Sequence, residues 1–244
     1  MDKMIEKSFG GYKLHIYKNK LELSSNVHKF IETQIVQTLK TKSRFQFCVS
    51  GGSTPKSVYQ LLSKSDITWE KVDIFLGDER CVNPMSEFSN SLMLKNSLLT
   101  NYGSKAFFYE IFSEKKVDDN ISKKLLISKL YERCTSNPPS FDLSLLGLGD
   151  DGHTASLFPY QNNNPDDIVI FNEGKGLKRI SLTPKLLSAS SKIIFLVSGS
   201  SKQLALKRLL DKNESEERTP SKLIKSSNQI SIFCDEESSK DLLT

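Results

Sequence analysis

The sequence predicts an α/β protein with a mostly parallel central sheet and helices on both faces. Short apolar, β-rich runs alternate along the chain with stretches of helical periodicity, and this alternation is typical of parallel sheets with crossover helices. One apolar run, 141–146, ends in Gly147 and Gly149, and two aspartates and a histidine follow within four residues. In open α/β sheets such a loop lies at the carboxyl end of a strand, where ligands bind.

The expected strands are short and apolar, and they cover residues 14–17, 45–50, 72–76, 106–109, 141–146, 179–182, 193–197 and 230–233. The first expected helix places one set of apolar residues on a single face, namely Val27, Phe30, Ile31, Ile35 and Leu39. The second begins near Pro55, which suits the first helical position, with Thr54 as its N-cap. Further helices are expected over 89–100, 118–134, 184–190 and 201–211.

The chain has the size and composition of a globular protein. Its 244 residues are 37% hydrophobic and include 14 Phe and 7 Tyr, enough for a substantial core. Two polar stretches, 161–167 and 211–222, are interpreted as surface loops too short to separate domains, so we expect residues 1–244 to form a single domain. No run approaches the roughly 18 apolar residues of a membrane span, and residues 1–13 are charged. A cytoplasmic protein without a membrane partner is therefore expected.

Charge and cysteine content exclude several classes of protein. The net charge is +5, but the 34 basic residues are scattered among 29 acidic ones, without a dense basic stripe or a nucleic-acid motif. We therefore expect no nucleic-acid partner, whereas a mild positive field suits an anionic small molecule. The four cysteines form no CxxC pair, which argues against zinc and against a disulfide framework. Cys48, inside an apolar run, is expected to be a buried, reduced thiol.

A glycine-rich turn, Ser50-Gly51-Gly52-Ser53-Thr54, follows the second expected strand. Glycines allow the backbone to approach a ligand, and the helix N-terminus that follows offers free N–H groups to a phosphate. The alternative is a tight turn that only needs positive φ angles. The turn lacks the Gly-Lys-Ser/Thr of a Walker A loop and the GxGxxG dinucleotide pattern. ATP and NAD are poorly supported, and no cofactor is expected.

Three charged residues, Asp78-Glu79-Arg80, follow the strand expected over 72–76 and therefore emerge at the same edge of the sheet. The planar guanidinium of Arg80 is suited to bind a phosphate or carboxylate with two hydrogen bonds. The alternative is a structural ion pair between Arg80 and Asp78 or Glu79.

Asp151 and His153 are the candidate catalytic pair. Histidine titrates near neutrality and can take and return a proton, and an adjacent carboxylate can orient its ring and stabilise its protonated form. The alternative for His153 is a residue that caps a helix or structures the loop. The spacings typical of zinc ligands are absent, so no metal is expected.

Five stretches carry a resemblance to a known family. Residues 146–159, Leu-Gly-Leu-Gly-Asp-Asp-Gly-His-Thr-Ala-Ser-Leu-Phe-Pro, closely resemble the signature of the 6-phosphogluconolactonases, within the glucosamine-6-phosphate isomerase/lactonase superfamily. Residues 50–55 look like its early glycine-rich loop, and residues 76–82 with Ser89-Asn90 look like its second block. Residues 179–183 and 198–202 resemble two later blocks, and the order along the chain is that of the family.

The resemblance implies a Rossmann-like, three-layer α/β/α fold of the glucosamine-6-phosphate isomerase type. It implies hydrolysis of 6-phospho-D-glucono-1,5-lactone to 6-phosphogluconate, the second step of the oxidative pentose phosphate pathway. The partner is then a small phosphorylated sugar lactone. In this mechanism neutral His153 takes a proton from water, Asp151 supports it, and Asp78 is the next candidate base. No metal is required, and we expect a monomer or a weak homodimer.

Two later basic residues, Arg179 and Lys202, would ordinarily be interpreted as solvated surface charges. In the wider superfamily the matching positions hold the substrate phosphate, so the resemblance assigns them that role together with Ser50, Gly51, Gly52, Ser53 and Arg80. The neighbouring Lys178 and Lys207 fit the pattern less well.

Two competing functions remain open. A glucosamine-6-phosphate deaminase/isomerase shares the aspartate and Asp-Gly-His blocks, but its pattern continues Ile-Ala-Phe-Asn-Glu-Pro, with the glutamate handling protons. Here Phe158 occupies the place of that glutamate and cannot transfer a proton. The other alternative is a sugar-phosphate sensor that binds its ligand without turnover.

Overall fold

A central sheet of eight strands organises the molecule, and its order is β1-β2-β11-β10-β7-β3-β4-β6. The computed structural model describes residues 4–111, 119–134, 136–163 and 166–243. The strands are β1 (Ile5–Phe9), β2 (Tyr12–Tyr17), β3 (Phe45–Val49), β4 (Val72–Leu76), β6 (Phe107–Tyr109), β7 (Leu143–Gly147), β10 (Lys192–Val197) and β11 (Ile230–Asp235). Every neighbouring pair is parallel except β1 with β2. The predicted mostly parallel sheet is confirmed.

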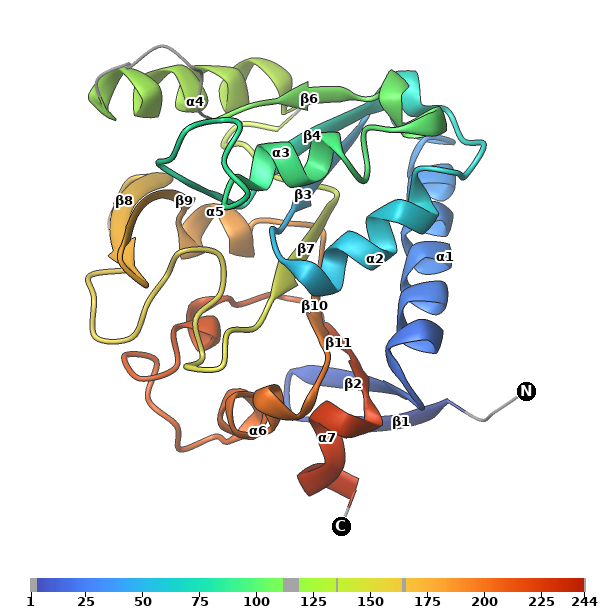
Figure 1. The fold of residues 1–244 in the computed structure, drawn as a ribbon, viewed down its shortest axis with the longest axis vertical. Helices are drawn as coiled ribbons and strands as arrows, with labels where there is room; N and C mark the ends of the chain where they lie inside the picture. The colour runs from blue at the N-terminus through green and yellow to red at the C-terminus, as the bar shows by residue number, and fades with distance from the viewer. Residues whose placement is uncertain (1–3, 112–118, 135, 164–165, 244) are drawn as a thin grey trace.

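Helices cover both faces of this sheet (Figure 1). On one side lie α1 (Lys20–Thr38) and α2 (Ser53–Leu62), and on the other lies α5 (Pro184–Ser188). The remaining helices are α3 (Asn90–Lys95), α4 (Asp119–Arg133), α6 (Gln203–Leu210) and α7 (Glu236–Leu243), with 3-10 turns η1 (Trp69–Lys71), η2 (Asn101–Lys105), η3 (Ser200–Lys202) and η4 (Pro220–Leu223). None of the helices in the described ranges is long and apolar enough to cross a membrane.

Some predicted boundaries change. The N-cap of α2 is Gly52, which makes no side-chain capping bond, so Pro55 is the third helical residue and Thr54 is not the cap. The helix expected over 89–100 ends at Lys95, before the separate turn η2. Residue 118 of the expected fourth helix, residues 164–165 of the first polar loop and residues 1–3 lie outside the described residues.

A second, antiparallel sheet stands beside the first, on the same side as α5 (Figure 1). It has the order β5-β9-β8 and consists of β5 (Asp78–Arg80), β9 (Leu177–Leu182) and β8 (Val169–Gly174). The run 179–182, predicted among the strands that alternate with helices, belongs to this small sheet instead. Its pairing partners come from a three-residue polar strand and from the hairpin strand before it.

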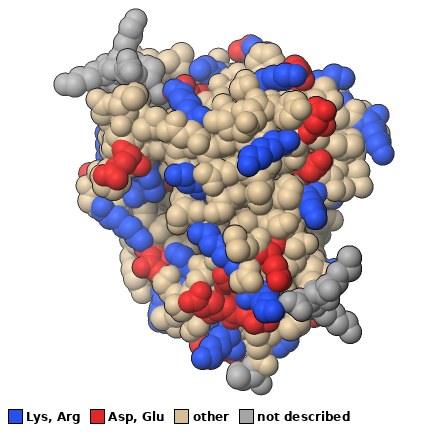
Figure 2. All heavy atoms as spheres, turned by 45° about the vertical axis from the view of Figure 1, so that its right-hand side comes forward, with Lys and Arg blue, Asp and Glu red and all other residues tan. Residues whose placement is uncertain are grey.

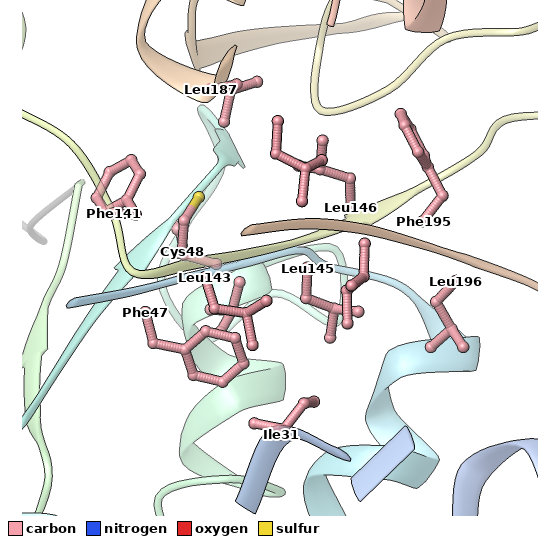
Figure 3. Packing of buried hydrophobic residues seen from close by; sticks show 14 of the residues in the cluster. Ile31, Phe47, Cys48, Phe141, Leu143, Leu145, Leu146, Leu187, Phe195 and Leu196 are labelled. Atoms are coloured by element: carbon pink, nitrogen blue, oxygen red, sulfur yellow. The ribbon is translucent and has the colours of Figure 1, made fainter. Parts of the chain in front are cut away.

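The core is continuous on both faces of the main sheet. Figure 3 shows Phe47, Leu143 and Leu145 on the face toward Ile31 of α1. Leu146 and Phe195 lie on the opposite face, toward Leu187 of α5, and all of these side chains are buried. Helices on both faces explain why the central strands read as unbroken apolar runs rather than as alternating ones.

The strand order reverses at the centre of the sheet. β3 and β7 are neighbours, and from them the chain builds outward in opposite directions, to β4 on one side and to β10 on the other. In an open parallel sheet this switch point leaves a crevice beyond the carboxyl ends of the strands. The loops that follow β3 and β7 are the glycine-rich turn and the Asp151–His153 segment, so the topology brings the predicted site together.

Candidate active site

A cavity of about 260 Å³ lies at this switch point. It is lined by residues that follow β3, β4, β7 and β10, and by the hairpin between β8 and β9. All but one of the predicted site residues line it, namely Ser50, Gly51, Gly52, Ser53, Asp78, Arg80, His153, Arg179 and Lys202. The remaining one, Asp151, is not part of the lining but contacts His153 directly. Residues predicted from five separate blocks of sequence therefore share one site.

The Asp151–His153 pair has the geometry of an oriented imidazole. His153 Nδ1 lies 2.5 Å from Asp151 Oδ1, and the same oxygen accepts the backbone N–H of His153 at 3.1 Å. The loop needs its glycines here: a Cβ on Gly149 would lie 2.0 Å from His153 Nδ1, and Gly152 has a φ of +92°. The alternative of a helix cap for His153 does not hold, because its side chain pairs with Asp151 and lines the cavity.

The charge of Asp151 is favoured by its partner. Burial alone would raise the pKa of Asp151, but the hydrogen bond and charge of His153 outweigh burial and hold that pKa well below its ordinary value. An ionised carboxylate can only accept, so the shared proton is carried by Nδ1 of the imidazole. In neutral His153 the other ring nitrogen, Nε2, is then the acceptor, which is the tautomer a general base needs.

Phe158 forms one wall behind the pair. Its ring centroid lies 4.8 Å from that of His153, and the Arg179 guanidinium carbon lies 5.3 Å from the Phe158 ring centroid. The ring is buried. A Cβ on Gly174 would lie 2.2 Å from it, so the hairpin backbone passes directly over the ring. One apolar side chain thus supports both the candidate base and a candidate anion-binding arginine.

Two arginines face each other across the small sheet. The register of β5 and β9 pairs Arg80 with Arg179, an arrangement of like charges that is unfavourable unless an anion or acid compensates it. Burial and the proximity of Arg80 both lower the pKa of Arg179, although a guanidinium stays protonated in proteins. Arg80 Nη1 donates to Phe88 O at 2.6 Å, while its buried Nε has no hydrogen-bond partner in the structure. The register therefore brings together two guanidinium groups that could hold an anion, and that role stays a prediction.

The acidic neighbours of Arg80 are engaged elsewhere. The Glu79 carboxylate accepts backbone N–H groups of Arg80, Asn90 and Ser91. The Asp78 carboxylate is buried, accepts the Ser156 hydroxyl at 2.5 Å and lies 3.8 Å from Arg179 Nη1. Asp78 is therefore placed to orient Arg179, and its selection as a candidate base stays a prediction.

The glycine-rich turn faces the cavity with polar groups. Gly52 has a φ of +109°, and a Cβ on Gly51 would lie 1.9 Å from Asn90 Oδ1, so both glycines are required by the local backbone. The Ser50 hydroxyl is buried and has no hydrogen-bond partner in the structure. The N-terminus of α2 begins at the next residues and carries partial positive charge. The backbone needs glycine at both positions, and the turn also lines the cavity. Phosphate binding by this turn stays a prediction.

The last basic group of the lining comes from the loop after β10. Asp235 at the end of β11 accepts the Ser198 hydroxyl at 2.5 Å and the Gly199 N–H, and this fixes the loop that leads to Lys202. Burial lowers the pKa of Lys202.

Among the charged residues that line the cavity, sequence reasoning missed one, Lys175. It lies in the two-residue turn of the β8–β9 hairpin and pairs with Asp150, Nζ to Oδ1, at 2.9 Å. The only signal in the sequence is Gly-Lys-Gly between two apolar runs, which predicts a turn but not where its tip lies.

The expectation of a metal-free site stays a prediction. Asp150, Asp151 and His153 offer ligand atoms within 4.8 Å of one another. Two of them are hydrogen-bonded to each other, and the third is paired with Lys175.

A larger groove of about 750 Å³ lies between α1 and α2, but its lining contains no His, Asp, Glu or Arg among the described residues.

Comparison with known proteins agrees with this geometry. The model of the family described as glucosamine-6-phosphate isomerases/6-phosphogluconolactonase matches residues 18–232. The chain belongs to this family. Within it, the chain is 32% identical over 207 residues to the 6-phosphogluconolactonase of a Nostoc species, covering 82% of this chain and 85% of the relative. It is 31% identical to the Thermotoga maritima 6-phosphogluconolactonase, covering 74% and 81%.

Solved structures share the fold of this family member. A 6-phosphogluconolactonase from Shewanella baltica superposes with a TM-score of 0.81 at 24% identity, covering 96% of this chain and all of that one. One from Trypanosoma brucei gives a TM-score of 0.80 at 22% identity and covers 96% of this chain. The implied three-layer fold of the isomerase/lactonase family is confirmed.

Proposed function

We propose that this chain hydrolyses 6-phospho-D-glucono-1,5-lactone to 6-phosphogluconate, the second step of the oxidative pentose phosphate pathway. The observation that carries the proposal is the His153–Asp151 pair at a cavity lined by four basic side chains and one acidic side chain. The names of the matching relatives support the same activity.

The chemistry needs one proton carrier. Neutral His153 takes a proton at Nε2 from a water molecule as the water oxygen bonds to C1 of the lactone. The electron pair of the carbonyl moves onto its oxygen, then returns and expels the ring oxygen, which takes the proton back from His153. Asp151 stabilises the imidazolium in between. General acid–base help of this kind is worth about 10² to 10⁴-fold in rate.

The phosphate and the developing oxyanion need donors rather than bases. Arg179 and Arg80 supply guanidinium groups on one side, and Lys202 supplies an ammonium group on another. The backbone of the glycine-rich turn and the unpaired Ser50 hydroxyl add neutral donors. A cavity with this surplus of positive charge favours a doubly charged phosphate ester.

The isomerase/deaminase alternative is disfavoured by Phe158. A glutamate that moves protons in that chemistry would have to occupy a position filled here by a buried aromatic ring packed on His153. The ring has no exchangeable proton, so enolisation lacks its second proton carrier. A lactone needs no enolisation, because its ester is already activated.

The test generates the lactone in situ from glucose 6-phosphate with purified dehydrogenase. 6-Phosphogluconate release is followed with metal chelated, for wild type and for His153→Ala. Fast hydrolysis by wild type and a folded variant near the spontaneous rate are expected. Equal rates for wild type, variant and buffer would overturn the lactonase and favour a sugar-phosphate sensor. A fully active variant would keep the activity and move the base to Asp78.

A further inference from the structure

The tip of the β8–β9 hairpin is built into the wall of the cavity. Arg179 Nε donates to Gly174 O at 3.2 Å, and the hairpin backbone crosses the Phe158 ring at Gly174. Lys175, the next residue, therefore starts from a backbone that is tied to the anion-binding arginine and to the aromatic wall behind His153. Its side chain joins Arg80, Arg179 and Lys202 in the lining.

The backbone at Lys175 is unusual for a lysine. Gly174 pairs with Leu177, so the turn has two residues, and both have positive φ, +51° at Lys175 and +74° at Gly176. Turns of this kind prefer Asn, Asp or Gly at the first position, because a Cβ crowds the following carbonyl oxygen there, and only a missing Cβ or a short polar side chain that bonds the local backbone relieves this. The turn itself therefore gives no reason for a lysine at position 175. Backbone strain of this sort is typical of functional positions.

The present partner of Lys175 holds it weakly. Its ion pair with Asp150 is exposed, with 52% and 58% of the two side chains accessible, and exposed pairs of this type contribute little stability. The charge of Lys175 also reaches further into the site, where it adds to the effect of burial in lowering the pKa of Lys202 and to the effect of His153 in lowering the pKa of Asp151. A phosphate ester in the cavity offers more negative charge and a more desolvated contact than Asp150 does.

We propose that Lys175 is a substrate-binding residue that pairs with Asp150 in the empty site and transfers to the substrate's phosphate when it binds. The hairpin tip then helps to select phosphorylated over unphosphorylated lactones. This inference rests on the proposed function for the identity of the substrate.

Two variants separate binding from a structural role. Lys175→Asn replaces the strained lysine by a residue that the turn prefers, and Lys175→Met keeps the length of the side chain without its charge. Lys178→Met is the matched control, because Lys178 is adjacent to Arg179 on β9 and lies over the Phe171 ring, outside the cavity. KM and kcat are measured for the phosphorylated lactone and for D-glucono-1,5-lactone, and the Kd of 6-phosphogluconate is measured by calorimetry.

Both Lys175 variants are expected to raise KM and Kd for the phosphorylated compounds about five- to twenty-fold, with kcat and the unphosphorylated lactone little affected. Lys175→Asn should keep or raise the melting temperature, which a structural role would not allow. Asp150→Asn should tighten binding of 6-phosphogluconate when Lys175 is present but not in the Lys175→Met background. In that background no ammonium group is left to move from Asp150 to the phosphate.

Unchanged KM and Kd in both Lys175 variants, or an equal loss in Lys178→Met, would overturn the role of Lys175 whatever the turnover. A wild type that binds 6-phosphogluconate but does not hydrolyse the lactone would overturn the proposed function alone, because Lys175 is still judged from the Kd. A wild type that neither binds nor hydrolyses would overturn both.

Discussion

At the scale of single residues, the site depends on which hydrogen-bonding groups are already committed. Asp78 accepts the Ser156 hydroxyl and lies near Arg179, whereas Asp151 accepts the backbone N–H of His153 and contacts its imidazole. We therefore propose different functions for the two carboxylates, although both stand near the cavity. We assign orientation of the arginine to Asp78 and orientation of the base to Asp151.

Asp151→Asn is expected to keep the fold and lose most of the activity. An amide can donate its N–H to Nδ1 and so stabilise the wrong tautomer, which leaves the proton on Nε2. We expect kcat to fall about 10² to 10⁴-fold with a smaller change in KM. Steady-state kinetics with the coupled assay check this, and Asp167→Asn, an exposed aspartate paired with Lys123, is the control. Unchanged kcat in Asp151→Asn would show that the pair is structural.

At the scale of elements, loops that carry site residues are fixed by buried carboxylates at the strand ends. Asp235 at the end of β11 accepts the Ser198 hydroxyl and the Gly199 and Ser238 N–H groups, so it ties the loop before Lys202 to the start of α7. Burial alone would raise the pKa of Asp235, but these hydrogen bonds outweigh it and hold the pKa below its ordinary value. The ionised form is therefore part of the folded structure.

Asp235→Asn is expected to reduce the free energy of unfolding by about 2 kcal/mol at neutral pH, because a charged acceptor of several bonds is lost. A lowered folded-state pKa means that this stability is present above the unfolded pKa of about 4 and disappears as the pH falls through the folded value. The two proteins should thus differ in urea unfolding at pH 7 and converge in acid. A pH-independent difference would contradict the assignment. The KM of Asp235→Asn for the phosphorylated lactone should also rise a few-fold, because the loop that positions Lys202 is no longer fixed.

The sequence predicted elements better than their pairing. The strands at 72–76 and 193–197 were expected because they are short, largely apolar runs, a pattern that survives any arrangement of neighbours. β5 escaped prediction because Asp78-Glu79-Arg80 is short and polar. Its strand character comes from β9, which is distant in the sequence. Lys175 was missed for the same reason, since its position depends on how the hairpin docks on Phe158.

At the scale of the whole molecule, the site is assembled from segments far apart in the chain. Its lining extends from Ser50 to Lys202, and β2 and β11, from opposite ends of the chain, are adjacent in the main sheet. Basic and acidic side chains are interspersed on the face shown in Figure 2, a distribution compatible with an electrostatic preference confined to the cavity. We propose that residues 1–244 form a single domain and that it acts as a monomer or a weak homodimer, without a nucleic-acid partner.

A single folding unit has a calorimetric consequence. Strands of the main sheet come from both ends of the described chain, β1 and β2 at one end and β11 at the other, and the cavity is lined by segments between them. We therefore expect one thermal transition whose calorimetric and van't Hoff enthalpies agree. Ligand at one hundred times its Kd should stabilise the folded state by about 2.7 kcal/mol and should shift the whole transition upward together. Differential scanning calorimetry with and without 6-phosphogluconate, at two protein concentrations, makes the measurement.

Two transitions, of which the ligand moves only one, would show that the chain contains two units. A melting temperature that rises with protein concentration in the absence of ligand would favour the homodimer, because association stabilises folded protomers by mass action.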